Sequence, residues 1–445
     1  MELRNLIVKA LKEEVVPAMG CTEPVAVALA GAKAKELIDF QEIDRVQVFV
    51  SPNIYKNGLA VGIPNTEEVG LYIAAALGLI GGKSEKDLKV LEGIEPNDVK
   101  VAKDLLESGK LSLDIKATKE KIYIEVELFT DGGSSKVVIK GKHNRFVYLE
   151  KQGEVILDEK EENAQAVDDK NAIYNLKIRE IIHEIEQVPY EDIKFMLDGL
   201  EMNEKIAQTG LKQNTGIGVG FTFLDNIEKG ILSNDLMNQA MMLTAAASDA
   251  RMSGVSLPVM SSNGSGNNGL TVILPIVAYK EKFQPEDEKI ARALAISHII
   301  NSYIKYYIGR LSALCGCGVA AGTGSAVGIA WLMGANDEQI DGVIKNMLAN
   351  TSGMICDGAK VGCALKLATS ASAAVQSALL AIGNNIVPSQ NGIVAETAEE
   401  TIKNLGTLSD KGMNTADEVI LRVMKEMQAK SNTNLDYSNK QNSIA

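Results

Sequence analysis

The sequence predicts an α+β protein in which a large all-helical domain is joined to a smaller antiparallel α/β lobe. Two observations lead to this prediction. Apolar residues recur with a period of two between residues 122 and 158, and at helical spacing over most of residues 172–406. The chain has 445 residues, of which 46% are hydrophobic and 23% charged, which is typical of a globular protein with a sizeable buried core.

The N-terminal region, residues 1–40, is predicted to form two helices that pack on the helical domain. Residues 3–15 and 24–38 carry apolar positions at helical spacing, and the two prolines and the glycine of residues 17–24 prevent one continuous helix. Cys21 is therefore expected in a loop that opens the second helix.

The lobe is predicted over residues 41–160. Residues 45–51 alternate as a strand, and residues 69–79 are apolar enough for a buried helix. Further strands are expected at residues 123–129, 136–140, 146–149 and 154–157. The Asp-Gly-Gly sequence at residues 131–133 predicts a hairpin turn between the first two of these. The polar residues 158–171 are expected to form an exposed linker.

The helical domain is predicted over residues 172–427, which include four of the five cysteines. Helices are expected at residues 172–187, 191–209, 235–253, 285–307, 315–333, 337–351, 366–382 and 395–406. Residues 270–277 are apolar and resemble a strand, and residues 428–445 form a polar tail.

The charge distribution argues against several classes of function. With 58 acidic and 45 basic residues the net charge is −13, and no basic cluster is present, so nucleic-acid binding is not expected. The N-terminus shows no signal peptide, so we expect a cytoplasmic protein. Residues 311–336 and 367–395 are uncharged, but their many small and polar residues predict buried helices and not membrane spans.

Four of the five cysteines are candidates for a metal centre. Cys315 and Cys317 are separated by one glycine, and Cys356 and Cys363 follow about 40 residues later. This spacing matches neither a zinc ribbon nor a bacterial ferredoxin. It fits better an iron-sulfur site with three cysteine ligands and one open iron, although buried core cysteines are an equally acceptable interpretation of the spacing alone.

Two loops could bind the polar ends of a small ligand. Residues 261–269 (SSNGSGNNG) could cradle a carboxylate with their N–H groups, or form a flexible linker. Residues 51–58 place Lys56 and Asn57 after a strand, where they could hold a ligand or form a solvated turn.

The histidines suggest no hydrolase triad. His143 and His183 are expected at the surface, and His298 lies in a helix away from any serine or cysteine motif.

Four segments, in order along the chain, resemble the iron-sulfur L-cysteine desulfidase family. They are residues 19–24 (MGCTEP), 51–58 (SPNIYKNG), 311–317 (LSALCGC) and 353–366 (GMICDGAKVGCALK). The C-terminal half is also similar to the α part of iron-sulfur L-serine dehydratases, although the cysteine spacing and proline content differ.

The resemblance implies a 4Fe-4S cluster held by Cys356, Cys363 and either Cys315 or Cys317, of which we favour Cys315. The open iron would serve an α,β-elimination of L-cysteine to pyruvate, ammonia and hydrogen sulfide without pyridoxal phosphate. Cys21 is then the expected base, because a helix N-terminus favours its thiolate.

The remaining expectations concern the substrate and partners. For capture of the amino-acid substrate we expect Lys56, Asn57, Ser262, Asn263, Gly264 and Asn267. No nucleic-acid or membrane partner is expected, and a homodimer is left open. The alternatives are an iron-sulfur L-serine dehydratase and a non-enzymatic metal or redox-sensing protein.

Overall fold

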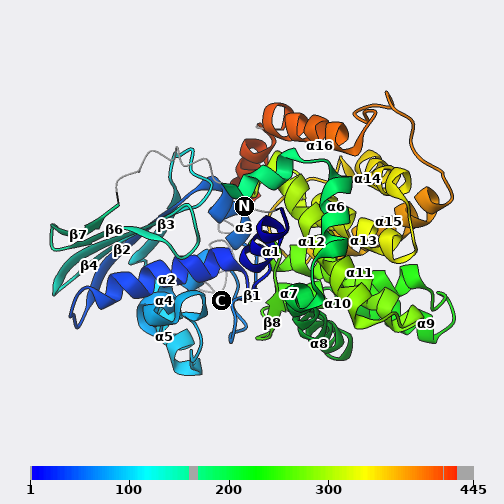
Figure 1. The fold of residues 1–445 in the computed structure, drawn as a ribbon. Coiled ribbons are helices and arrows are strands. Elements are labelled where there is room, and N and C mark those ends of the chain that lie inside the picture. The colour runs from blue at the N-terminus through cyan, green and yellow to red at the C-terminus, as the bar shows by residue number, and fades with distance from the viewer. Residues whose placement is uncertain (1–2, 160–168, 414, 428–445) are drawn as a thin grey trace.

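The computed structural model describes residues 3–159, 169–413 and 415–427 of this α+β protein. A sheet lobe and a larger helical domain lie side by side, and the first helix, α1 (Leu3–Glu14), is seen near their junction (Figure 1). Part of the predicted linker, residues 160–168, lies outside the described residues. The predicted tail, residues 428–445, also lies outside them.

The lobe contains a six-stranded sheet in the order β3-β2-β4-β5-β6-β7. Its strands are β2 (Ile43–Val50), β3 (Leu111–Ile115), β4 (Tyr123–Thr130), β5 (Gly133–Lys140), β6 (Phe146–Lys151) and β7 (Glu154–Asp158). The predicted strands are present, but the sheet is mixed because β2 and β3 are parallel. Residues 51–110 form helices that return the chain to the same end of the sheet, as a parallel pair requires.

The lobe also contains the helices α2 (Thr22–Glu36), α3 (Pro52–Gly58), α4 (Leu71–Ile80), η1 (Ser84–Lys89) and α5 (Pro96–Glu107). Of these, α2 and α4 pack directly against the sheet, and α5 packs on α4. We expected residues 1–40 to pack together on the helical domain, but the structure separates them. Helix α1 buries Ile7 and Leu11 in the helical domain, whereas α2 buries Val25 and Leu29 in the lobe. Helix α2 is buried on all sides, so it requires both the sheet and α4 to cover it.

The helical domain begins at residue 169. Several of its helices are largely buried and form its core. Its elements are η2 (Asp169–Asn175), α6 (Ile178–Gln187), α7 (Tyr190–Ile193), η3 (Lys194–Leu197), α8 (Asp198–Gln213), α9 (Val219–Glu228), α10 (Leu236–Met252), α11 (Gly266–Phe283), α12 (Asp287–Ile308), η4 (Cys317–Ala321), α13 (Gly322–Leu332), α14 (Asp337–Thr351), α15 (Cys363–Ile382), α16 (Ala398–Thr407) and η5 (Leu408–Gly412). Residues 270–277 belong to helix α11 and not to a strand. Periodicity could not distinguish the two, because every residue from 266 to 279 is buried.

Helix α15 is long and apolar enough to cross a membrane by length and composition alone. In the structure more than half of it is buried, and it packs against α10, α13 and α14. Helix α15 is therefore a core helix of the folded domain.

The connections between the lobe and the helical domain include a small sheet and a C-terminal helical segment. The short strands β1 (Pro17–Met19) and β8 (Pro258–Met260) pair antiparallel. Residues 415–427 are helical and return to the lobe, where Leu421 joins the core.

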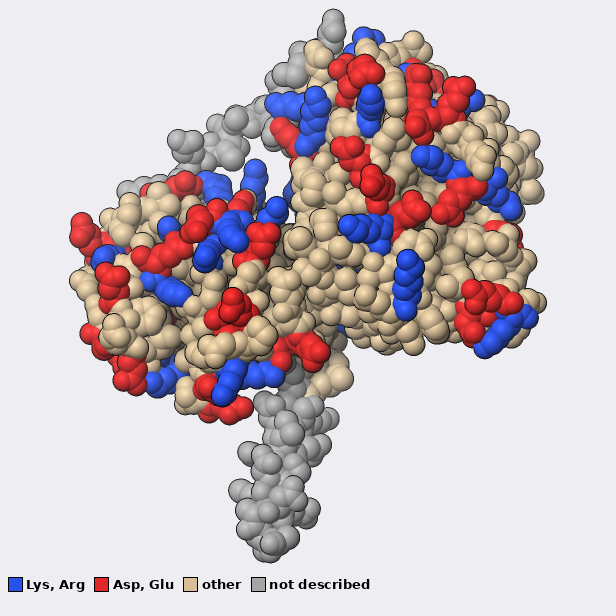
Figure 2. Space-filling model, turned by 90° about the horizontal axis from the view of Figure 1, so that it is seen from below, with Lys and Arg blue, Asp and Glu red and all other residues tan. Residues whose placement is uncertain are grey.

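One face of the molecule shows how the charges are distributed. Seen from below, acidic and basic side chains alternate over the lobe, and the helical domain has a broad area with few charges (Figure 2). This face carries no continuous basic patch of the kind that binds a phosphate backbone.

Candidate functional site

Two loops of the helical domain bring the four C-terminal cysteines together. The loop before η4 and the loop before α15 pair through an antiparallel bridge between Leu314 and Ile355. The amides of Cys315 and Cys356 donate hydrogen bonds of 2.8 and 2.7 Å to carbonyls of the opposite loop. Because side chains alternate along an extended chain, Cys315 and Cys356 lie on the same face of this bridge.

Cys315 and Cys317 differ in acidity although they are separated by a single glycine. A hydrogen bond from the Cys317 thiol lowers the pKa of Cys315 to about 6, and the Gly318 N–H acts in the same direction. The same bond raises the pKa of Cys317 well above its ordinary value. Cys315 is therefore the more readily ionised of the two.

The four sulfurs form one electrostatic unit. Burial raises the pKa of Cys356, and it raises that of Cys363 to about 11. A negative charge on Cys315 raises the pKa of each of the other three thiols. The four thiols therefore resist simultaneous ionisation, and ligation to a metal would be needed to deprotonate several of them.

The four cysteines are thiol donors of the kind that an iron-sulfur cluster uses. Within the described residues, no three His, Cys, Asp or Glu side chains are grouped so as to hold one metal ion. Zinc would need its ligands within about 2.0–2.3 Å of a common centre. The thiolates of a four-iron cluster instead each bind a different iron, so they are spread more widely.

Cys21 precedes α2 and lies beside this group. It clusters with Val61 and Met252, and this cluster packs against Cys363. The pairing of β1 with β8 holds the Cys21 loop in place. Burial raises the pKa of Cys21, so the lowering that we expected from its position at a helix N-terminus does not prevail.

Arg251, near the end of α10, is a site residue that the sequence analysis did not single out. It donates to the Gly20 carbonyl at 2.7 Å and to Asn267 Oδ1 at 3.2 Å, and it hydrogen bonds to Cys21. The side chain is buried and has no carboxylate partner among the described residues. Arg251 could have been noticed in the sequence, because it is the one cation in the alanine-rich residues 245–252.

The glycine-rich loop is a tight turn and not a flexible linker. Asn263 (φ 52°) and Gly264 (φ 71°) both have left-handed backbones, and a bridge between Ser262 and Ser265 closes the turn. An Asn-Gly pair is well suited to this conformation. Ser265 then caps α11 and lies 3.9 Å from Cys317 Sγ, which places the loop next to the cysteines.

The predicted side chains of this loop are already engaged in hydrogen bonds. Ser262 Oγ accepts a bond of 2.8 Å from Asn301, and Asn263 Nδ2 donates a bond of 2.5 Å to Ser302. Asn268, which we did not predict, is buried, and its amide atoms have no partner among the described residues. Asn268 is thus a buried amide in this region whose hydrogen-bonding capacity the described residues do not use.

Lys56 and Asn57 of α3 place the lobe against the second cysteine loop. Gly358 packs so closely that an added Cβ would lie 2.2 Å from the Lys56 carbonyl oxygen. The buried Lys56 ammonium pairs with Asp417 at 2.6 Å, and its charge opposes the effect of burial on the pKa of Cys356. Asn57 donates to Glu23 at 3.3 Å. Both side chains therefore have protein partners in this structure.

Lys305, in the last turn of α12, is a second cation that the sequence analysis missed. It is buried, and a Cβ added to Gly316 would lie 2.9 Å from its Nζ. Burial lowers its pKa to about 8, against the charges of the nearby cysteines. Lys305 could have been noticed in the sequence, because it is the one charged residue among the apolar and aromatic residues 303–308.

Two histidines differ from their predicted environments. His143 is half-buried and not at the surface, and burial lowers its pKa while the charge of Glu23 opposes this. His298 is buried with a pKa lowered to about 3, and its Nδ1 lies 2.9 Å from Ser262 Oγ. The fold creates this Ser–His contact, but His298 Nε2 has no partner among the described residues, so no triad is formed.

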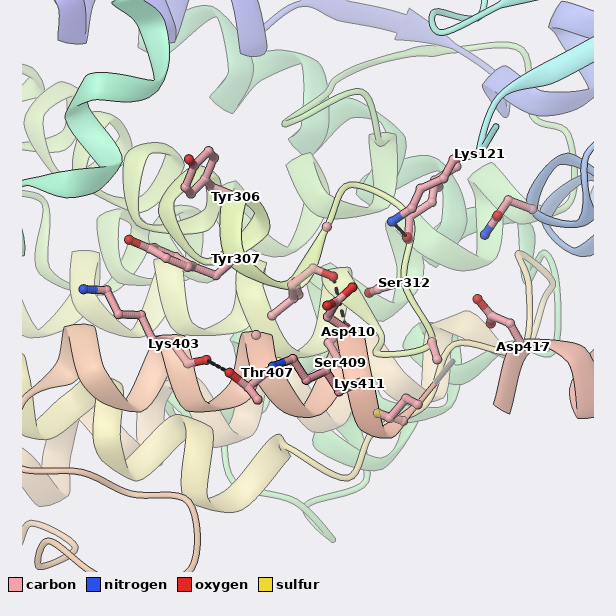
Figure 3. A pocket seen from close by; sticks show the side chains of 17 residues that line it. Lys121, Tyr306, Tyr307, Ser312, Lys403, Thr407, Ser409, Asp410, Lys411 and Asp417 are labelled. Carbon is pink, nitrogen blue, oxygen red and sulfur yellow. Dashed lines mark hydrogen bonds between the residues drawn. The ribbon is translucent and has the colours of Figure 1, made fainter. Parts of the chain in front are cut away.

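A cavity of about 530 Å³ adjoins the cysteine loops (Figure 3). Ser312 and Ala313 line it on one side, and Asn53 and Lys121 of the lobe contribute to its wall. None of the predicted site residues lines this cavity. It is connected to the site through Asp417, which lines the cavity and pairs with Lys56.

Comparison with known proteins assigns the family. The profile described as serine dehydratase alpha chain matches residues 85–422. The chain belongs to this family. Proteins called UPF0597 from Alkaliphilus oremlandii and Alkaliphilus metalliredigens are each 65% identical over 428 residues, covering 96% of this chain and 100% and 96% of theirs. A UPF0597 protein from Clostridioides difficile is 56% identical over 421 residues, 94% of this chain and 98% of its own.

Membership of the serine dehydratase alpha chain family indicates a lyase of the iron-sulfur type. The matched residues include Arg251, Lys305 and the four clustered cysteines, whereas Cys21 and Lys56 lie before them. The family therefore supports the chemistry of the cysteine group more directly than it supports one amino acid as the substrate.

Proposed function

We propose that this protein is an iron-sulfur lyase that converts L-cysteine and water to pyruvate, ammonia and hydrogen sulfide. The observation that supports this most directly is the group of four buried or half-buried cysteines, which interact electrostatically beside the buried Arg251 and Cys21. Cys315, Cys356 and Cys363 would hold a 4Fe-4S cluster. When bound, the cluster supplies an open iron that acts as a Lewis acid towards the substrate β-substituent.

Cys21 is the proposed acceptor of the substrate Cα proton, at its Sγ. Its raised pKa makes the thiolate a stronger base once it is formed, and the Arg251 guanidinium favours that ionised form. Burial among Val61 and Met252 excludes water from the sulfur. These contacts would hold Cys21 in one orientation and keep the abstracted proton from exchanging freely.

Substrate capture is proposed for Lys56 and Asn57 of the lobe and for Ser262, Asn263, Gly264 and Asn267 of the turn. Because most of these polar side chains already have protein partners, a ligand would displace those partners or use the backbone N–H groups. Such exchange suits a small zwitterion that is bound in a nearly dry cleft between two domains.

The two candidate enzymes, a cysteine desulfidase and a serine dehydratase, differ in the amino acid that they use as substrate. The family description favours L-serine. The sulfur of L-cysteine is the softer ligand and the better match for an open iron, and this is the reason we propose cysteine. A structural zinc protein has less support, because the family description is that of a dehydratase enzyme.

The deciding experiment is anaerobic reconstitution with iron and sulfide, followed by assays of pyruvate and sulfide released from each amino acid under argon. We expect a brown protein that forms pyruvate faster from L-cysteine than from L-serine, and that loses this activity when it bleaches in air. Faster turnover of serine would make it a dehydratase. A colourless, inactive protein would reject both enzymes.

A further inference from the structure

Four lysines surround the cysteines closely enough for their charges to act on the thiols. They are Lys56, Lys305, Lys360 and Lys366. Three of them are already paired with carboxylates of the chain. Lys56 pairs with Asp417 at 2.6 Å, and both Lys360 and Lys366 pair with Asp357.

Lys305 is the exception among these four. It has no carboxylate partner among the described residues, although only 5% of the residue is exposed. Its ammonium donates a hydrogen bond to the carbonyl of Arg310, which carries no negative charge. A buried cation without a carboxylate partner is unfavourable, so the position of Lys305 is best explained by the negative charge of the cysteine group and of what that group would bind.

The position of Lys305 identifies the kind of negative group. Its Nζ lies against the turn between Cys315 and Cys317, where a Cβ added to Gly316 would be only 2.9 Å away. The charges of Cys315, Cys317 and Cys356 all act on it. Three thiolates exceed the positive charge of an oxidised four-iron core, so a cluster at this site would be anionic overall.

We propose that Lys305 is the counter-cation of an anionic iron-sulfur cluster and that its charge sets the reduction potential and the retention of that cluster. This inference rests on the proposed cluster but not on cysteine as the substrate. Net charge is one of the factors that determine cluster potentials, so removal of the ammonium should make reduction harder. It should also weaken the hold of the protein on iron, by roughly tenfold or more for a charge this close in a buried site.

The test compares Lys305→Met and Lys305→Gln, which remove the charge, with Lys305→Arg, which retains it. Lys345→Met is the matched control, because Lys345 is similarly buried in the same domain but is paired with Asp341 at 3.1 Å. After anaerobic reconstitution, the midpoint potential is measured by redox titration followed by electron paramagnetic resonance. The rate of iron release to a chelator is measured under argon, and thermal unfolding of each apo-protein verifies folding.

We expect both neutral variants to show a more negative potential and about tenfold faster iron release, with Lys305→Arg and Lys345→Met close to the wild type. A wild-type potential and release rate in the neutral variants, or an equal shift in Lys345→Met, would overturn the proposal, as would a wild-type chain that takes up no cluster. A wild-type chain that holds a cluster but releases no sulfide from L-cysteine would reject only the proposed function.

Discussion

At the scale of single residues, the four clustered cysteines have distinct environments. Cys315 accepts a hydrogen bond from Cys317, and its pKa of about 6 favours a thiolate at neutral pH, whereas the pKa values of the other three are raised. A thiolate is the form that binds iron. This difference favours our proposal that Cys315 is the third ligand and that Cys317 donates a hydrogen bond to it.

We therefore predict different outcomes for two adjacent substitutions. Cys315→Ala should lose most of the iron and acid-labile sulfide that the wild type binds after anaerobic reconstitution. Cys317→Ala should retain the cluster, although the ligand then lacks one hydrogen bond. Iron and sulfide assays on the two purified variants provide the measurement, and a full cluster in Cys315→Ala with none in Cys317→Ala would reverse the assignment.

At the scale of elements, close backbone packing joins α3 of the lobe to the second cysteine loop. Gly358 has a φ of 95° and lies against the Lys56 carbonyl, so a side chain would be both strained and obstructed. Ala60 and Lys360 form a parallel bridge beside this contact. The loop that carries Cys356 and Cys363 is thus held by the lobe as well as by its own domain.

Gly358→Ala should consequently destabilise the protein by about 2 kcal/mol or more and weaken cluster retention. Gly353→Ala is the control in the same segment, because a Cβ there would meet nothing within 4 Å. It should change stability by no more than about 0.5 kcal/mol. Urea denaturation of both apo-proteins tests this, and equal stability of the two would mean that α3 does not constrain the loop.

At the scale of the whole molecule, residues from both ends of the described chain connect the lobe to the helical domain. Helix α1 belongs to the helical domain and α2 to the lobe. The helical residues 415–427 return to the lobe, where Leu421 is buried and Asp417 reaches Lys56. This segment therefore helps to hold the lobe over the cysteines.

Truncation of the Leu421 side chain tests whether residues 415–427 help to attach the lobe. Leu421→Ala should cost about 2 kcal/mol of stability, as expected for a buried leucine at a packed contact. Val423→Ala lies two residues along the same segment but is 46% exposed, so it should have an effect within about 0.5 kcal/mol. Both are compared by thermal and urea unfolding. If Leu421→Ala is as stable as Val423→Ala, the segment contributes little to lobe attachment.

The sequence by itself determined the strands of the lobe, most of the long helices and the cysteines as candidate ligands. These features depend on local patterns, namely alternation, helical spacing and glycine-bordered cysteines, which are visible in short segments. Helix α11 and the parallel pairing of β2 with β3 were not predictable in this way. A fully buried apolar segment has no periodicity to read, and strand direction depends on the path of the intervening chain.

Only the tertiary structure decided which charges surround the site. Arg251 and Lys305 lie in helices that are far along the chain from Cys21, and nothing in their own segments indicates a partner. The pairing of β1 with β8 holds the Cys21 loop, to which Arg251 hydrogen bonds, and the bridge between Leu314 and Ile355 holds the two cysteine loops whose charges act on Lys305. Burial then determines their electrostatics, because a charge or a thiol removed from water responds to neighbours that solvent would otherwise screen.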